Sequence, residues 1–388
     1  MVVSLAPRIT AVAPSSTLAI TAKAKALKAQ GVDVVNLAGG EPDCDTPAHI
    51  KQAAIAAIQE GFTKYTPTAG IPDLRAAVAK TLTADLGVPY QASEVVVTNG
   101  AKQALYNALQ VLCRPGDEVL IPSPYWVSYP EMVTLAGGTP VFVKTSQADR
   151  FRLTVESVER AVTAKTRLLL LNSPSNPTGS VLPKASLLPL ADLVARRGLV
   201  VISDEIYDQL SYDEPHVSIA ACHPALRAQT LIVNGVSKAF AMTGWRIGWA
   251  AGPQPLIDAM ITLQDHATSN ASSISQRAAL AALTGDRSTI TRMAEEFKHR
   301  RDLLVEALRT VPGLSCVPPQ GAFYAFCDIS ASGLSSTVFA ERLLTERHVA
   351  VIPGAGFGWD THIRLSFCTS RAALEEGVRR LRAFLEAL

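Results

Sequence analysis

The chain has 388 residues, enough for a large core and two domains, and its 36 basic side chains nearly balance its 34 acidic ones. It has no basic block of the kind that binds nucleic acid, and no apolar stretch long enough to span a membrane. The six cysteines lack a C-x-x-C pair and the seven histidines form no ligand-spaced cluster with them, so neither a disulfide framework nor a metal site is expected.

The first 45 residues lack a signal-peptide pattern, because Arg8 and three lysines interrupt any apolar run, and we expect a cytoplasmic protein. A helical pattern reaches about Gln30, and an apolar strand over residues 32–37 follows. The strand ends in the turn Gly39-Gly-Glu-Pro42, whose two glycines let the backbone approach a ligand. A plain turn is the alternative.

A helix is predicted next, with Thr46 as its N-cap, Pro47 at its first position and Gly61 at its C-terminal end. The segment Lys64-Tyr-Thr-Pro-Thr-Ala-Gly-Ile-Pro-Asp-Leu-Arg75 follows it. On local grounds Tyr65 could be a half-buried loop tyrosine.

Apolar runs then alternate with helical patterns, which indicates a large α/β domain. We expect a seven-stranded, mostly parallel sheet with strands at 95–98, 118–121, 140–143, 167–171, 199–203, 231–233 and 247–250. Such sheets bind ligands beyond their strand ends. The residues that follow each strand are therefore the candidates for a site.

Polar and aromatic residues do follow these strands. Gly100 opens an amphipathic helix, whose first N–H groups could bind a phosphate. Trp126 could stack on a flat ring, although core packing would also explain it. Asn176 lies in Asn-Pro-Thr-Gly, which also forms plain turns. Asp204 ends a buried strand, where a carboxylate needs a cationic partner.

Lys238 lies among small and apolar residues, which lower the pKa of an amine and make it a nucleophile toward carbonyl carbon. Arg246 follows shortly after and could grip a phosphate with two hydrogen bonds. An aldehyde with a phosphate describes pyridoxal phosphate. Taken alone, the pair could equally be a surface lysine and an unrelated arginine.

A long charged helical pattern begins near Asp286 and is expected to lead into a smaller C-terminal domain. That domain should contain strands at 321–327 and 362–367, and a late apolar segment at 349–357. Arg364 has the fork geometry that grips a carboxylate, although a lone arginine in a strand is usually solvated. We expect three parts: 1–45 packing with the small domain, 46–285 as the large cofactor-binding domain, and 286–388 as the bridging helix and small domain.

Together these motifs resemble class I aminotransferases of the fold-type I pyridoxal-phosphate family, and most of all the bacterial aspartate aminotransferase branch, over nearly the whole chain. The resemblance implies that Lys238 binds pyridoxal 5′-phosphate as an imine and then moves the substrate proton as general base and acid. It implies that Asp204 pairs with the pyridine nitrogen, which makes the ring an electron sink. Glu205 is expected to point elsewhere.

Other cofactor contacts are implied by the same resemblance. Tyr207 and Asn176 would bind the ring 3-oxygen, and Trp126 would lie on the ring. The phosphate would be held by Gly100, Ala101, Lys102, Arg246 and, from the partner subunit of a homodimer, Tyr65. Ser237 would also contact the cofactor. The cis peptide bonds of the family are expected before Pro124 and Pro177.

The implied substrates are an amino acid and a 2-oxo acid, with aspartate and 2-oxoglutarate as the expected pair. Residues in the substrate positions of the family are Gly40, Trp126, Asn176, Arg364, Lys102, Ser16 and Thr17. Lys102 and the segment with Ser16 and Thr17 could meet a distal carboxylate.

Two positions depart from the relatives. Ala13 stands where prephenate aminotransferases have a basic residue, so prephenate use is not expected, and Gly235 stands where many relatives have a phosphate-binding serine. The alternatives are an aromatic, alanine or broad-specificity aminotransferase, or a carbon–sulfur lyase on the same fold. A regulator that senses pyridoxal phosphate is disfavoured, because the chain starts with the N-terminal segment of the enzyme. No nucleic-acid or membrane partner is expected.

Overall fold

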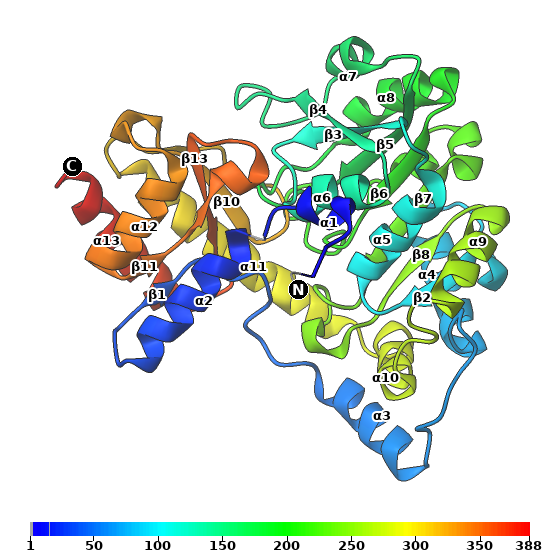
Figure 1. The fold of residues 1–388 in the computed structure, drawn as a ribbon. Coiled ribbons are helices and arrows are strands. Elements are labelled where there is room, and N and C mark those ends of the chain that lie inside the picture. The colour runs from blue at the N-terminus through cyan, green and yellow to red at the C-terminus, as the bar shows by residue number, and fades with distance from the viewer. Residues whose placement is uncertain (1–2, 15) are drawn as a thin grey trace.

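The computed structural model describes residues 3–14 and 16–388, and the side chains of residues 16–19 are left aside. The chain forms two lobes that meet along one side (Figure 1). None of the helices in this described part is long and apolar enough to cross a membrane.

The larger lobe contains the seven-stranded sheet that the sequence predicts. Its order is β2-β8-β7-β6-β5-β3-β4, and only β8 runs antiparallel to its neighbours. The strands are β2 (Val95–Thr98), β3 (Glu118–Ser123), β4 (Thr139–Lys144), β5 (Thr166–Asn172), β6 (Val200–Asp204), β7 (Thr230–Gly235) and β8 (Gly248–Ala251). Each prediction falls within a few residues of its strand.

Helices cover both faces of this sheet, which is why its central strands are continuous apolar runs. One face packs on α5 (Ala101–Leu112), α6 (Ser128–Leu135) and α9 (Gln254–Asp265). The other face packs on helices from two clusters: α3 (Ala48–Gln59), α4 (Pro72–Leu86), α7 (Val155–Ala161), α8 (Lys184–Arg197) and α10 (Ser273–Thr284). The helices cover the two faces of the sheet, so a ligand can approach it at the ends of the strands.

The smaller lobe is built on a four-stranded sheet in the order β12-β13-β10-β9. Its strands are β9 (Ser315–Cys316), β10 (Tyr324–Asp328), β12 (Ile352–Pro353) and β13 (His362–Ser366). Around it lie α11 (Ser288–Arg309), which links the lobes, and α12 (Ser336–Arg347) and α13 (Arg371–Leu385). In β10 and β13, Phe326 and Arg364 are register partners.

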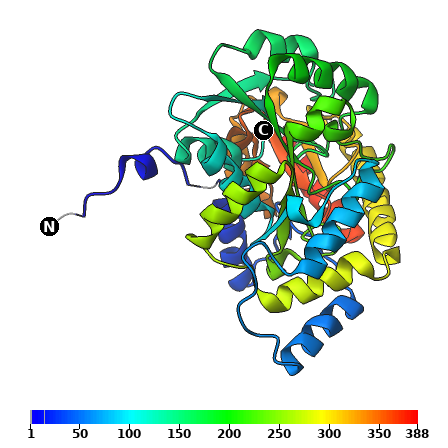
Figure 2. The same ribbon diagram turned by 90° about the vertical axis from the view of Figure 1, so that its right-hand side faces the viewer.

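The start of the chain packs on this smaller lobe. Strand β1 (Val35–Asn36) pairs in parallel with β11 (Val349–Ala350), and α2 (Ser16–Ala29) contacts β12. The segment before α2, with α1 (Pro7–Thr10), extends away from the body of the protein (Figure 2). Short 3₁₀ turns complete the chain: η1 (Ala92–Glu94), η2 (Ile219–Ala221), η3 (Pro224–Ala228), η4 (Thr243–Trp245), η5 (Ser330–Ser332) and η6 (Gly354–Phe357).

Some local predictions were wrong. Helix α3 begins after Pro47 and Thr46 does not cap it, because the Thr46 hydroxyl donates to the carbonyl of Ala241 at 2.7 Å. The strand predicted at 32–37 is shortened to β1. The cis bonds before Pro124 and Pro177 are confirmed, and a third precedes Pro174.

Candidate active site

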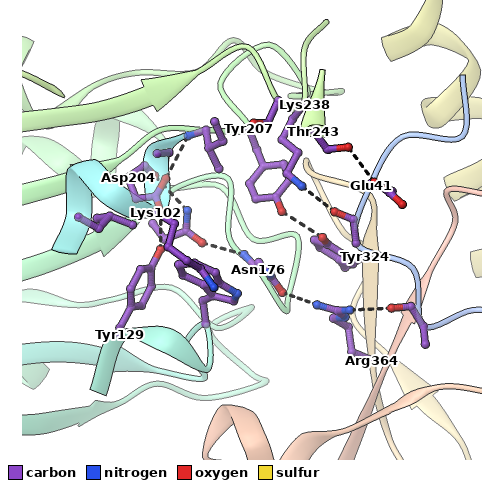
Figure 3. A pocket seen from close by; sticks show the side chains of 18 of the residues that line it. Glu41, Lys102, Tyr129, Asn176, Asp204, Tyr207, Lys238, Thr243, Tyr324 and Arg364 are labelled. Carbon is purple, nitrogen blue, oxygen red and sulfur yellow. Dashed lines mark hydrogen bonds between the residues drawn. The ribbon is translucent and has the colours of Figure 1, made fainter. Parts of the chain in front are cut away.

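A cavity of about 370 Å³ lies at the strand ends, between the larger sheet and strands β10 and β13. Most of the residues singled out from the sequence line it together (Figure 3). They are Gly40, Ala101, Lys102, Trp126, Asn176, Asp204, Tyr207, Ser237, Lys238, Arg246 and Arg364. The parallel strands bring Asn176, Asp204 and Lys238 together because successive strands end at the same rim, whereas Gly40 follows β1 and Arg364 comes from β13.

Lys238 follows β7 and reaches into this cavity. Its Nζ donates to the carbonyl oxygen of Gly40 at 2.6 Å, so the glycine turn seen in the sequence holds the amine. Burial lowers the pKa of Lys238 to about 8, helped by Arg364 and Arg246 and opposed by Cys368 and Glu41. A large fraction of the amine is therefore neutral near pH 8, as a nucleophile or base must be.

Asp204 ends β6 and is only 4 % exposed. Tyr129 donates its hydroxyl to Asp204 Oδ2 at 2.7 Å, and the Ile206 N–H donates to Oδ1 at 3.2 Å. Burial raises the pKa of Asp204 to about 6, and these two hydrogen bonds oppose that rise. The two hydrogen bonds thus fix the orientation of the carboxylate. A cation placed beside it would stabilise its negative charge, which burial alone disfavours.

The start of α5 forms a cradle with Arg246. Gly100 has φ +80° at the N-cap of α5, and a Cβ there would lie 2.5 Å from Nη2 of Arg246. Gly248 is equally restricted, because its Cβ would lie 2.3 Å from the nitrogen of Ala101. Glycine at both positions lets a guanidinium approach a helix N-terminus, which is an anion-binding arrangement.

The Arg246 guanidinium is oriented by two backbone carbonyls. Nη1 donates to Thr243 O at 2.8 Å and Nη2 to Asn99 O at 3.3 Å. Ser237 is buried and lines the same cavity. At Gly235 a Cβ would lie 2.9 Å from the carbonyl oxygen of Ile247, so a larger residue there would require a small backbone shift in this chain.

Arg364 enters the cavity from β13 and is only 3 % exposed. Its Nη1 donates to Asn176 Oδ1 at 3.0 Å and its Nη2 to Ala38 O at 3.1 Å. The buried Nε has no hydrogen-bond partner among the described residues. A buried N–H without a partner is costly, so this guanidinium is prepared for a ligand that accepts hydrogen bonds.

Lys102 and Trp126 form the opposite wall. The Lys102 ammonium lies 4.7 Å from the centre of the Trp126 ring, a cation–π distance. Burial and the charge of Arg246 lower the pKa of Lys102 below its usual value. The edge of Trp126 packs against Tyr129 with 5.3 Å between ring centres, which fixes the orientation of the indole.

Several lining residues were missed by reasoning from the sequence: Thr21, Glu41, Tyr129, Asn172, Thr243 and Tyr324. Tyr129 stands in the same aromatic segment as Trp126. Tyr324 stands in the strand predicted at 321–327, for which the sequence indicated no role in the site. Glu41 stands in the glycine turn Gly39-Gly-Glu-Pro42, and Asn172 stands just after the strand predicted at 167–171. The prediction that Glu205 points elsewhere is confirmed, since it accepts hydrogen bonds from Ser203 and Ser218 at 2.8 and 2.5 Å.

Of the predicted site residues that the structure describes, Gly100 and Tyr65 are not among the lining residues of this cavity. Tyr65 is 91 % exposed and lies outside the lining. Ser16 and Thr17 belong to α2, but their side chains lie outside the described part of the structure. The next turn of α2 does reach the site, because Thr21 lines it.

Known proteins match this chain over nearly its full length. The family model described as aminotransferase class I and II matches residues 32–381. An aspartate aminotransferase of Geobacillus stearothermophilus is 49 % identical over 99 % of both chains, and an aspartate/prephenate aminotransferase of Cereibacter sphaeroides is 46 % identical over 99 % of both. A Thermus thermophilus aspartate aminotransferase solved with maleate aligns with a TM-score of 0.95 and 45 % identity, over 98 % of this chain and 100 % of that one.

Proposed function

Because the chain belongs to the class I and II aminotransferases, we propose that it transfers the amino group of L-aspartate to 2-oxoglutarate, giving oxaloacetate and L-glutamate. The observation that carries the choice of acidic substrates is Lys102, a second cation facing the same cavity as Arg364. Two carboxylates of one substrate need two cations once water is excluded. The names of the relatives, which are aspartate aminotransferases, support aspartate as the amino donor.

The residues present fit pyridoxal 5′-phosphate, the cofactor that the family implies. The Gly100–Arg246 cradle suits its phosphate, Asp204 suits its pyridine nitrogen, and Tyr207 suits its 3-oxygen. Lys238, held by Gly40 with a pKa near 8, suits its aldehyde. When bound, the cofactor supplies an electron sink for the bond that breaks at Cα.

The protein's own groups would then handle binding and proton transfer. Arg364 binds the α-carboxylate with its two-pronged donor set, and Asn176 holds the guanidinium in position. Lys238 Nζ takes the proton from Cα of the bound amino acid and later returns a proton as the acid. The carbonyl of Gly40 keeps this amine inside the cavity.

The proposal extends to the division of the chain. Residues 46–285 form the large cofactor-binding domain, 286–388 form the bridging helix and small domain, and 1–45 pack with the small domain. The pairing of β1 with β11 and the contact of α2 with β12 support the last of these assignments.

Replacing Lys102 by alanine should lower kcat/KM for aspartate and glutamate by roughly 10- to 100-fold and leave alanine and phenylalanine nearly unchanged. A charge-assisted hydrogen bond of about 1.5–3 kcal/mol corresponds to that factor. Steady-state rates with the four amino acids measure it, after the cofactor content of the variant has been matched to the wild type.

Lys64→Ala is the matched control, because Lys64 is exposed and lies outside the cavity. Equal losses on acidic and neutral substrates would make Lys102 structural. If the wild-type protein barely uses aspartate, the substrate assignment is wrong and a broad or aromatic aminotransferase takes its place. Prephenate belongs in the same panel, with low activity expected from Ala13.

The proposal includes a homodimer in which Tyr65 serves the partner's site. Its phenol is 91 % exposed in the single chain, and Val3 and Leu5 of the N-terminal segment are also highly exposed. We expect Tyr65→Phe and Lys238→Ala chains, each weakly active alone, to recover to about a quarter of wild-type activity when mixed in equal amounts. Each heterodimer would combine both lesions in one site and leave the other intact.

Native mass spectrometry should show that the heterodimers form, and activity is then measured on the same sample. A mixture of Asp204→Asn with Lys238→Ala chains is the control, because both residues line the cavity of their own chain and every site of that heterodimer keeps one lesion. If heterodimers form without recovery, Tyr65 acts within its own chain.

A further inference from the structure

Two buried tyrosines join the two sheets at the floor of the cavity. The hydroxyl oxygens of Tyr207 and Tyr324 are 3.0 Å apart, and the side chains are 4 % and 1 % exposed. Their rings meet edge to face, with centres 5.9 Å apart. Tyr207 follows β6 of the larger sheet and Tyr324 begins β10 of the smaller one, so this contact bridges the lobes (Figure 3).

The hydrogen-bond direction follows from counting protons. Each phenol has one proton to donate, and burial raises the pKa of Tyr207 well above 10, so it stays protonated. If Tyr207 donates that proton to an acceptor in the cavity, its oxygen can only accept from Tyr324. Tyr324 must then be the donor in the pair.

Tyr324 also touches the residues on either side of the pair. The Arg364 guanidinium lies 4.3 Å above the centre of its ring. A Cβ on Gly40 would lie 3.6 Å from the Tyr324 hydroxyl, which places the turn that holds Lys238 beside it. One side chain therefore contacts the carboxylate-binding arginine, the proposed cofactor donor and the lysine turn.

We propose that Tyr324 is a positioning residue: its hydroxyl donates to Tyr207 and so directs the Tyr207 proton to the 3-oxygen of the cofactor, while its ring supports Arg364. The inference rests on the proposed function, because Tyr207 needs a cofactor oxygen to receive its proton. Hydrogen bonds in a chain polarise one another, so losing the bond that Tyr324 donates should weaken the bond that Tyr207 donates to the 3-oxygen.

The test is the pH titration of the visible absorption of the cofactor-loaded protein without substrate. In Tyr324→Phe the ring and its contact with Arg364 remain but the hydroxyl is lost. Without the Tyr324 hydroxyl, Tyr207 donates a weaker hydrogen bond to the 3-oxygen, which then carries more negative charge. That charge retains the titrating proton of the cofactor more strongly, so the pH midpoint of the absorption change should rise by about half a unit to one unit. In a Tyr207→Phe background the same change should have no further effect, because Tyr324 acts through Tyr207.

Tyr212→Phe is the matched control. Its half-buried hydroxyl donates to the carbonyl of Ala322, and Tyr212 does not line the cavity. A midpoint that stays unchanged in Tyr324→Phe, that moves equally in Tyr212→Phe, or that moves equally in the Tyr207→Phe background overturns the inference. If the wild-type protein binds no pyridoxal phosphate at all, the proposed function itself fails, which is a distinct outcome.

A second measurement does not depend on any variant folding. In a crystal structure of the loaded wild-type protein, the two hydroxyl oxygens should remain within hydrogen-bond distance, with Tyr207 also bonded to the 3-oxygen.

Tyr324→Leu separates the two roles of the side chain, because it also removes the ring. Tyr324→Leu should raise KM for the amino acid above the value in Tyr324→Phe. An equal KM in both variants would refute the claim that the Tyr324 ring supports Arg364.

Discussion

Replacing Lys238 by alanine should lower kcat for transamination by roughly 10⁴-fold or more, because one change removes both the cofactor's covalent attachment and the group that moves the Cα proton. No neighbour can substitute. Among the described lining residues the other amine is that of Lys102, and it lies over the Trp126 ring. Stopped-flow and steady-state rates with saturating pyridoxal phosphate measure the loss.

The attachment point can be mapped independently of activity. Borohydride reduction of the loaded wild-type protein, followed by peptide mapping, should place the label on Lys238. The same procedure applied to Lys238→Ala should give no labelled peptide, whereas Lys64→Ala should be labelled as the wild type is. A label on Lys102 or Lys64 in the wild-type protein would refute the assignment.

Much of the fold could be read from the sequence because local patterns and the fold agree. The buried strands β5, β6 and β7 are runs of Leu, Val and Ile bounded by polar turns, and such runs identify parallel strands covered on both sides. Once the sheet is predicted, its strand ends bring Asn176, Asp204 and Lys238 to the same rim. The strand ends gave the candidate residues, and the resemblance to the aminotransferases gave their roles.

The contacts that cross between lobes could not be predicted in this way. The hydroxyl pair of Tyr207 and Tyr324 joins residues far apart in the chain, and nothing in either local pattern indicates the partner. The same reason explains Thr46: locally it is a good N-cap, but its hydroxyl is used by the loop that follows Lys238. Tertiary hydrogen bonds override a local preference worth about 1 kcal/mol.

Replacing Arg364 by leucine should lower kcat/KM for every amino acid by roughly 10²- to 10³-fold, acidic and neutral alike. The α-carboxylate is common to all of them, and removing one partner of a buried charge pair costs about 2–5 kcal/mol. Steady-state rates with aspartate, glutamate, alanine and phenylalanine measure the effect, with cofactor content checked by absorbance.

This pattern distinguishes Arg364 from Lys102, whose loss should affect acidic substrates only. Arg364→Lys keeps the charge but loses the fork, and it should recover only part of the activity, because an ammonium cannot reproduce the bidentate geometry. Arg152→Leu is the control: that arginine is half-buried and bonded to Gln320 at 2.7 Å, but lies outside the cavity. If Arg364→Leu reduced the rates with aspartate and spared those with alanine, Arg364 would bind the distal carboxylate instead. The buried Nε of Arg364, which has no hydrogen-bond partner among the described residues, would then be available to that second carboxylate.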